Sequence, residues 1–277
     1  MQNVYALSDI HGQGQAFFEM LEKIRFSPED KLYIIGDVVD RGPDGIQLLE
    51  YIREQPNMEL LMGNHEDMFL RTMDDEESWY ETWIFNGGGV TLASLMSFPK
   101  KEQEQCIEFV RKLPLYRMIT VENKRYLLVH AGIDAALGDS EDKISQMDRD
   151  NLLWIRREFF NAALACPYTV VFGHTPTGAL LYYAGTLTEE AREQAAAFHI
   201  TKWDHRIAID SGAAYGENLG CLRLNDQEEF YIKYEKILTR FDRYDKFNNG
   251  LADVAQVVAH LIGSEEVTGS TPVISLS

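Results

Sequence analysis

Apolar runs and helical patterns alternate along the first part of the chain. Three apolar runs of four or five residues, typical of buried strands, lie at 4–7, 31–35 and 58–62. Each precedes a stretch whose apolar residues recur with helical spacing, at 15–24, 45–55 and 66–73. This alternation predicts βαβ units with parallel strands.

The rest of the chain follows the pattern less regularly. Residues 74–120 are rich in aromatic side chains and are predicted to be mainly helical. Further strands are predicted at 126–130, 169–174, 206–210, 221–224 and 229–235. The last two, joined by a short turn, are expected to pair in antiparallel fashion. The sequence therefore predicts an α/β fold with a mixed central sheet and helices on both faces.

Two segments fall outside this pattern. Residues 178–205 form a predicted insertion that is partly helical over 188–198. A lid or specificity loop and an idle surface insertion are both compatible with the stretch 188–198. The last twenty residues, VAHLIGSEEVTGSTPVISLS, resemble a peptide made when a reading frame continues into a transfer-RNA gene. A genuine peripheral helix with a loose tail is the alternative. We expect one domain over 1–245 and a peripheral or non-native tail over 246–277.

The composition is that of a globular protein with a substantial core. The 277 residues are 45% hydrophobic and 25% charged, which suits one large domain or two small ones. The net charge of −18 repels nucleic acid and anionic membranes, so neither is an expected partner. A small anionic substrate remains compatible with this charge, because cations at a site reverse the local sign.

The cysteines indicate a reducing compartment. Cys106, Cys166 and Cys221 are far apart and odd in number, which disfavours both disulfides and a thiolate zinc site. The N-terminal residues lack the features of a signal peptide, and no apolar run approaches the roughly 18 residues of a membrane span. We expect a cytoplasmic protein. We also expect a monomer, because no long apolar stripe is left over once the core is assigned.

Polar clusters follow five of the predicted strands. They are Ser8–Gly12, Gly36–Gly42, Gly63–Glu66, His130–Gly132 and Gly173–Pro176. Taken singly, each has an ordinary explanation as a helix N-cap or a turn. Ligands of open α/β sheets bind outside the carboxyl ends of the strands. Five clusters in equivalent places therefore predict one site at that edge.

The side chains in these clusters suit metal ions. Six oxygen and imidazole donors are available, from Asp9, His11, Asp37, Asn64, His130 and His174. Without thiolates, this set suits Mn²⁺, Fe or Zn²⁺ and does not select one of them. Six donors suggest two metals, and Asp37 is the natural bridge because it is central in the strand series. Paired metals lower the pKa of bound water and clamp the oxygens of an in-line displacement, which is phosphate-ester chemistry.

The motifs SDIHG, GDVVDRG, GNHE, HAG and GHT resemble those of the phosphoprotein phosphatase family of metallophosphoesterases, in its bacterial Ser/Thr branch. The resemblance covers about residues 4–235. It implies the calcineurin-like fold, a four-layer α/β/β/α sandwich, and two divalent metals with Mn²⁺ as the first candidate. One metal would be held by Asp9, His11 and Asp37. The other would be held by Asp37, Asn64, His130 and His174.

The resemblance also implies roles beside the metals. A hydroxide bridging the two ions would attack phosphorus. His65 would protonate the leaving oxygen, oriented by Asp40, whose carboxylate would favour the imidazolium. Arg41 would bind phosphate oxygens with its planar guanidinium. Arg156, in the segment LWIRREF, would be a second phosphate ligand, with a solvated position on a surface helix as its alternative.

The sequence departs from the family pattern at two positions. Ser8 replaces the usual glycine before Asp9, and we expect little change from it. Met62 stands where many members have an arginine, so one phosphate-binding cation is missing, which affects the substrate more than the reaction type. An aromatic cluster follows the third motif and is predicted to be core or a cap over the metal edge rather than a stacking platform; it comprises Trp79, Tyr80, Trp83 and Phe85.

The predicted function is a two-metal phosphomonoesterase acting on phosphorylated protein or peptide side chains, as a Ser/Thr or dual-specificity protein phosphatase. The alternative is a dinucleoside polyphosphate hydrolase of the diadenosine tetraphosphate type, which shares these motifs. Asp40, Arg41 and the WIRREF segment favour the first function. A non-catalytic binding module is disfavoured because no expected ligand is missing, and a general nuclease because of the net charge of −18.

Overall fold

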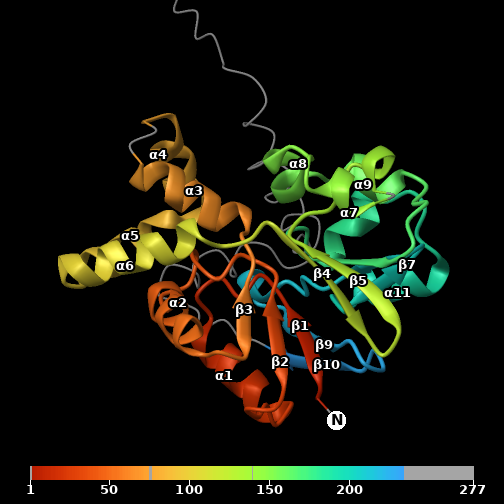
Figure 1. The fold of residues 1–277 in the computed structure, drawn as a ribbon, viewed down its shortest axis with the longest axis horizontal. Coiled ribbons are helices and arrows are strands. Elements are labelled where there is room, and N and C mark those ends of the chain that lie inside the picture. The colour runs from red at the N-terminus through yellow and green to blue at the C-terminus, as the bar shows by residue number, and fades with distance from the viewer. Residues whose placement is uncertain (1, 75–76, 139, 234–277) are drawn as a thin grey trace, which may run out of the picture. The chain divides into compact units, whose positions relative to one another are not determined.

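The computed structural model describes residues 2–74, 77–138 and 140–233. The predicted tail over 246–277 and its boundary lie outside these residues. The described strands form two five-stranded sheets (Figure 1), whereas the strand pattern alone predicted a single central sheet. Both sheets are mixed and flanked by helices, which confirms the layered fold implied by the family resemblance.

The first sheet is built on three parallel strands from the N-terminal part of the chain. Strands β1 (Val4–Leu7), β2 (Lys31–Ile34) and β3 (Met58–Leu60) pair side by side, as the βαβ pattern predicted. Strands β9 (Asn218–Arg223) and β10 (Glu229–Lys233) extend the sheet on the other side of β1 and are antiparallel. The carboxyl ends of β1, β2 and β3 therefore meet at one edge.

The second sheet has a parallel centre and antiparallel edges. Strands β5 (Lys124–Val129), β6 (Thr169–Phe172) and β8 (Arg206–Ala208) are parallel. The edges are β4 (Tyr116–Val121) beside β5 and β7 (Thr201–Trp203) beside β8. Two predictions are corrected here. Strand β4 ends the segment expected to be helical, and β7 makes the last part of the predicted insertion an edge strand of the sheet.

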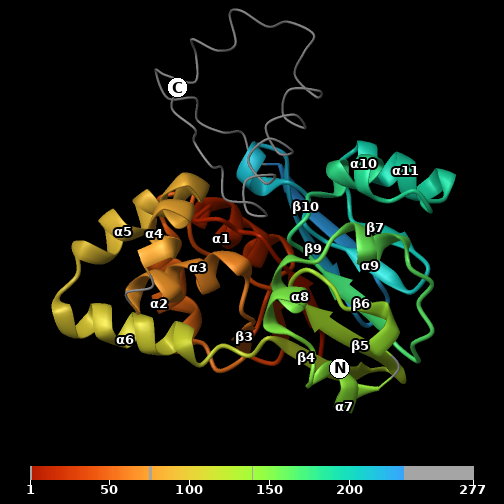
Figure 2. The same cartoon turned by 90° about the horizontal axis from the view of Figure 1, so that it is seen from above.

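Helices cover the outer faces of the two sheets. Helices α1 (Gly14–Lys23), α2 (Gly45–Glu54) and α3 (Asn64–Met73) follow β1, β2 and β3. A helical segment then runs through α4 (Glu77–Trp83), a π-helical turn (Ile84–Gly88), α5 (Gly89–Met96) and α6 (Lys100–Arg111). The second sheet carries α7 (Glu141–Ile144), α8 (Arg149–Trp154), α9 (Arg157–Asn161), α10 (Leu180–Tyr183) and α11 (Glu189–Ala196). Figure 2 shows α1–α6 on the side of the first sheet and α7–α11 on the side of the second.

Three apolar clusters account for the layers. Because side chains alternate across a strand, Tyr5 and Leu7 face the helices of the first sheet while Ala6 lies in a cluster with Leu128 and Val171 of the second sheet. The third cluster lies between the second sheet and its own helices. The two sheets therefore bury one face against each other, which brings the strand ends of both to a common edge.

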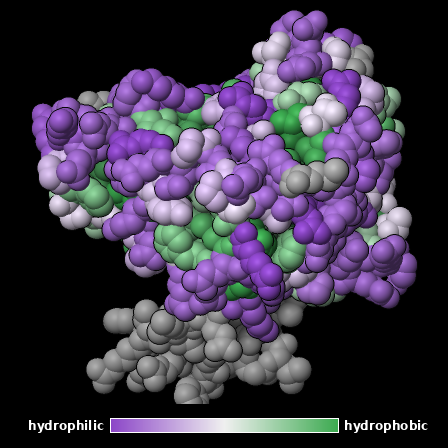
Figure 3. All heavy atoms as spheres, turned by 60° about the horizontal axis from the view of Figure 1, so that its bottom comes forward, coloured by the Kyte–Doolittle hydropathy of each residue, from purple (hydrophilic) through white to green (hydrophobic). Residues whose placement is uncertain are grey.

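The face of the molecule shown in Figure 3 is mainly hydrophilic. On the face in Figure 3, hydrophobic side chains gather in a few separate areas among hydrophilic ones. None of the helices in the described ranges is long and apolar enough to cross a membrane.

Candidate metal centre

The loops after five strands bring the predicted donors together. Those after β1, β2 and β3 come from the first sheet, and those after β5 and β6 from the second. All six predicted donors are buried, each with at most 8% of its surface exposed: Asp9, His11, Asp37, Asn64, His130 and His174. Burying so many polar and ionisable groups is costly unless they are paired or bind a cation.

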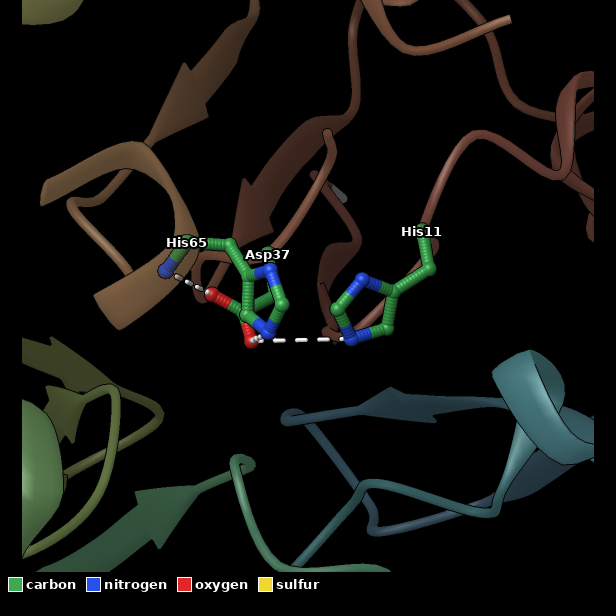
Figure 4. Close-up of side chains that lie close together, drawn as sticks. All are labelled: His11, Asp37 and His65. Atoms are coloured by element: carbon green, nitrogen blue, oxygen red, sulfur yellow. Dashed lines mark hydrogen bonds and ion pairs between the residues drawn. The ribbon is translucent and has the colours of Figure 1, made fainter. Parts of the chain in front are cut away.

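Asp37 lies between two groups of imidazoles. Its Oδ2 is 3.6 Å from His11 Nε2 and 3.9 Å from His65 Nε2 (Figure 4). Its Oδ1 is 3.5 Å from His130 Nε2, and His174 completes that second group. Each carboxylate oxygen thus faces a different cluster of donors. Asp37 has the geometry expected of a residue shared by two metal ions.

The second group has two acceptors facing each other. His130 Nδ1 lies 2.9 Å from the carbonyl oxygen of Ile35, which fixes the proton on that nitrogen and leaves Nε2 bare. Burial lowers the pKa of His130 to about 4, so the ring is neutral near pH 7. Yet Nε2 lies 2.8 Å from Asn64 Oδ1, itself 2.9 Å from His174 Nδ1. The lone pairs of His130 Nε2 and Asn64 Oδ1 repel each other at this distance, and a cation bound to both atoms would remove the repulsion.

The first group contains a residue that was not predicted as a ligand. His11 Nδ1 lies 2.9 Å from the carbonyl oxygen of Val39, which leaves Nε2 toward Asp37 free to bind a metal. The described residue that completes this group is His65, rather than Asp9. Asp9 instead accepts the backbone N–H of His174 with both carboxylate oxygens, at 3.0 and 3.2 Å. Its role as a ligand stays a prediction.

The charge states of these groups also suit bound cations. Burial raises the pKa of Asp9 well above its usual value, and the Asp210 carboxylate adds to the effect. Burial raises the pKa of Asp37 in the same way, followed by repulsion from Asp9 and Glu66. Burial lowers the pKa of His11 and His174 well below the usual value. A cation would reverse the penalty on the acids and bind the neutral imidazoles.

His65 is held by a buried carboxylate. Its Nδ1 lies 2.6 Å from Asp40 Oδ2, which also accepts the Trp83 indole N–H at 2.9 Å. Asp40 Oδ1 accepts the hydroxyl of Thr91 at 2.6 Å. Burial raises the pKa of Asp40 to about 7. The Asp40 carboxylate therefore fixes the ring orientation of His65, and two further donors, Trp83 and Thr91, hold this carboxylate in place.

The protonation of His65 differs from expectation. We expected Asp40 to favour the imidazolium, but burial lowers the pKa of His65 well below its usual value, and Arg41 and His130 lower it further. Arg41 Nη2 donates to His65 Nε2 at 3.2 Å, so that nitrogen is a bare acceptor here. Arg41 Nη1 also donates to the Tyr215 hydroxyl at 2.7 Å. A guanidinium at Nε2 disfavours a metal on the same atom.

The loops that carry the site have an unusual backbone. Six site residues have positive φ angles between 47° and 72°, namely Asp9, His11, Asp37, Asp40, Arg41 and His174. Such a conformation costs on the order of 1–3 kcal/mol per residue and is concentrated at functional sites. Close packing adds a constraint, because a Cβ on Gly63 would overlap Asp37 Oδ1. The glycine of the GNHE motif is needed for that approach.

Arg156 and Met62 differ in their placement. Burial is the main cause of the lowered pKa of His130 and of His174, and the positive charge of Arg156 lowers both further, so this charge acts on the second group. Met62 is 1% exposed and belongs to the apolar cluster of the first sheet, so this position contributes packing and no charge.

Several contributing residues were not assigned from the sequence. Glu66, fully buried, accepts the backbone N–H groups of Asp37, Val38, Val39 and Gly63 at 2.8–3.2 Å and so joins the second motif to the third. Its position inside GNHE could have indicated this. Thr91 and Tyr215 lie far from any motif, and nothing in the sequence marked them. The aromatic cluster divides, with Trp83 buried against Asp40 while Tyr80 and Phe85 are exposed.

Fold and site together define a phosphoesterase of the metal-dependent type, with paired His/Asp groups at the strand ends. Residues 3–202 match the family model described as calcineurin-like phosphoesterase, and the chain belongs to this family. It is 28% identical over 178 residues to serine/threonine-protein phosphatase 1 of Salmonella typhimurium, covering 63% of this chain and 79% of the relative. This similarity supports the phosphoprotein phosphatase assignment.

Other comparisons name a different substrate. The chain is 26% identical over 283 residues to the symmetrical bis(5'-nucleosyl)-tetraphosphatase of Aromatoleum aromaticum, covering 86% of this chain and 99% of the relative. A crystal structure provisionally described as a diadenosine tetraphosphatase has the same fold, with a TM-score of 0.58, 17% identity and coverage of 84% and 94%. Several other relatives match over about half of their length. Similarity therefore defines the reaction class and leaves the substrate open.

Proposed function

We propose that this protein is a two-metal phosphomonoesterase that removes phosphate from phosphorylated protein side chains. The observation that carries the proposal is Asp37, whose two oxygens each face one group of donors. Asp9, His11 and Asp37 would hold one ion, and Asp37, Asn64, His130 and His174 the other. The ions, with Mn²⁺ as the first candidate and Fe or Zn²⁺ as alternatives, would supply an activated water and charge neutralisation at phosphorus.

The chain's own residues would bind the phosphate and move the proton. Arg41 and Arg156 would bind two of its oxygens, since a planar guanidinium matches that geometry. When Arg41 turns to the phosphate it releases His65 Nε2, to which it donates in the free protein. The dianion then favours protonation of His65, and Asp40 at 2.6 Å keeps Nε2 directed at the leaving oxygen.

A protein substrate is favoured by the number of cations that this mechanism uses. The positive charges of Arg41 and Arg156 suffice to balance the negative charge of one phosphoryl group. A tetraphosphate chain carries more negative charge than these two arginines can balance. The similarity to the Salmonella protein phosphatase supports the same choice. A dinucleoside polyphosphate hydrolase is the second candidate, because the Aromatoleum relative aligns over nearly its whole length.

Phosphate release decides between these functions. The purified protein, supplied with Mn²⁺, should hydrolyse phosphoserine, phosphothreonine or phosphotyrosine peptides with a higher kcat/KM than diadenosine tetraphosphate. His65→Asn measured in parallel should lose the activity. Preferred cleavage of the dinucleotide would replace the substrate class and keep the reaction. No turnover of any of these, with metal bound, would contradict both functions.

A further inference from the structure

A cavity of about 630 Å³ lies next to the metal centre, within the size range of ligand-binding pockets. It is lined by the turn Asp134–Ala136 after β5 and by helices α8 and α9. Trp154 connects it to the site, because this residue lines the cavity and its ring lies nearly perpendicular to that of His174, with ring centroids 5.8 Å apart. The cavity and the second donor group therefore share Trp154 as a neighbour.

The lining carries only one sign of charge. Three carboxylates contribute to it, from Asp134, Asp150 and Glu158, and none of its lining residues within the described chain is basic. Asp134 uses Oδ1 to accept the Ala136 N–H at 2.9 Å, and Asp150 lies 3.3 Å from Arg71. Glu158 is exposed and forms no ion pair or hydrogen bond with the described residues. Negative charge in the cavity is thus only partly compensated.

The remaining walls suit the stem of a long cationic side chain. Trp154 and Ile155 line the cavity with apolar surface, and an indole attracts an ammonium or guanidinium group over its face. Lysine and arginine place a methylene stem on apolar surface while their charged ends seek carboxylates. A polyphosphate would meet repulsion from the same three acids.

We propose that this cavity binds a lysine or arginine side chain of the substrate, a few residues from the phosphorylated one, so that the preferred substrates are phosphopeptides with a neighbouring basic residue. This inference rests on the proposed function, because it presupposes a peptide bound at the metal edge. It adds a selectivity that the metal ligands themselves do not provide.

The test uses phosphoserine peptides of otherwise neutral sequence, with one lysine placed in turn at each of the four positions on either side. With the Mn²⁺-loaded protein, at least one position should raise kcat/KM about fivefold over the lysine-free peptide, the gain of a partly exposed ion pair. High salt should reduce the preference, because it screens the attraction. A flat profile, or a preference for peptides without lysine, would overturn the proposal.

Variants locate the effect. Glu158→Gln should abolish most of the lysine preference while leaving turnover of the lysine-free peptide and of para-nitrophenyl phosphate unchanged. Glu193→Gln, an exposed acid on α11, is the matched control and should keep the preference. An unchanged preference in Glu158→Gln together with Asp150→Asn would contradict the proposed cavity. Turnover of para-nitrophenyl phosphate or diadenosine tetraphosphate, with no peptide turnover, would instead refute the proposed function.

Discussion

The two sheets contribute unequally to the metal centre. The first sheet supplies every carboxylate of the predicted site, together with His65 and Arg41, on loops whose backbone is often left-handed. The second sheet supplies His130 and His174, two imidazoles that burial keeps neutral. In the proposed mechanism the first sheet would therefore provide the carboxylates and the proton transfer, whereas the side of the second sheet would complete one metal site and contribute Arg156 to phosphate binding. Asp37, which faces both groups, joins the two contributions.

The largest effect is expected from the residue that joins them. Asp37→Asn should lower kcat/KM by about 10²- to 10³-fold or more, because it removes the negative charge that both ions would share. The two ions are expected to stabilise the transition state by several kcal/mol, and this stabilisation would be largely lost. Steady-state kinetics with para-nitrophenyl phosphate measures this. The exposed Asp226→Asn is the control. Wild-type turnover in Asp37→Asn would refute the shared role.

His65→Asn tests the proton transfer assigned to the first sheet. The rate should fall about 10²-fold with a peptide, whose alkoxide leaving group needs a proton. It should fall less with para-nitrophenyl phosphate, because nitrophenolate leaves without one. Metal content should stay at the wild-type level. An equal loss on both substrates, together with lost metal, would make His65 a ligand, as its place beside His11 and Asp37 also allows.

Stability should depend on pH differently with and without metal. The pKa of Asp9 and of Asp37 is raised in the folded protein, so these acids oppose folding increasingly as pH rises from their ordinary pKa to the raised pKa of the folded protein, and the penalty is constant above it. Bound Mn²⁺ removes this penalty. The melting temperature gained from Mn²⁺ should therefore grow from pH 5 to pH 8, reaching about 5 to 10 °C at 100 times Kd. Thermal unfolding at each pH measures the gain, and a gain that falls with pH would contradict the assignment.

The second sheet should affect metal affinity more than chemistry. His174→Asn should weaken binding of one ion by at least about 10- to 100-fold, the loss known for outer-sphere partners alone. Added Mn²⁺ should restore most of the turnover, which Asp37→Asn would not allow. His199→Asn is the matched control, because His199 stacks on Tyr231 away from the site. A loss that excess Mn²⁺ does not restore would give His174 a direct role in chemistry.

The smallest effect is expected from removing the hydrogen bond that Trp83 donates to Asp40. Trp83→Phe removes the indole N–H that Asp40 accepts at 2.9 Å and should cost about 1–3 kcal/mol of stability, with a several-fold loss of kcat. Trp79→Phe on the same helix is the control, since its ring contacts Arg71 rather than Asp40. Equal melting temperatures and rates for the two variants would show that Asp40 does not depend on this bond.

The site residues at the strand ends could be predicted from the sequence because they lie in short, recognisable motifs. Strands β1, β2 and β3 and the helices after them were predicted nearly in place, and the motif residues do meet at one edge. Strand β4 was missed because it follows a long helical segment, and β7 because its three residues lie beside a clear helix. Division into two sheets depends on long-range packing that local periodicity does not contain.

Partners of the site residues were harder to predict. Thr91 and Tyr215 lie 51 and 174 residues from the groups they contact, Asp40 and Arg41. The pKa of His65 was expected to follow its nearest carboxylate, but burial outweighs it because the ring is 2% exposed and lies beside Arg41. Burial and distant contacts are set by the fold, so a motif alone does not determine them.

Metal stoichiometry tests the central claim most directly. Metal-free protein titrated with Mn²⁺ should bind two ions per chain, and the electron paramagnetic resonance spectrum should show magnetic coupling between them. In Asp37→Asn the coupling should disappear and the affinity for both ions should fall. One ion per chain in the wild type, or a coupled pair that survives Asp37→Asn, would contradict a centre built on the shared carboxylate.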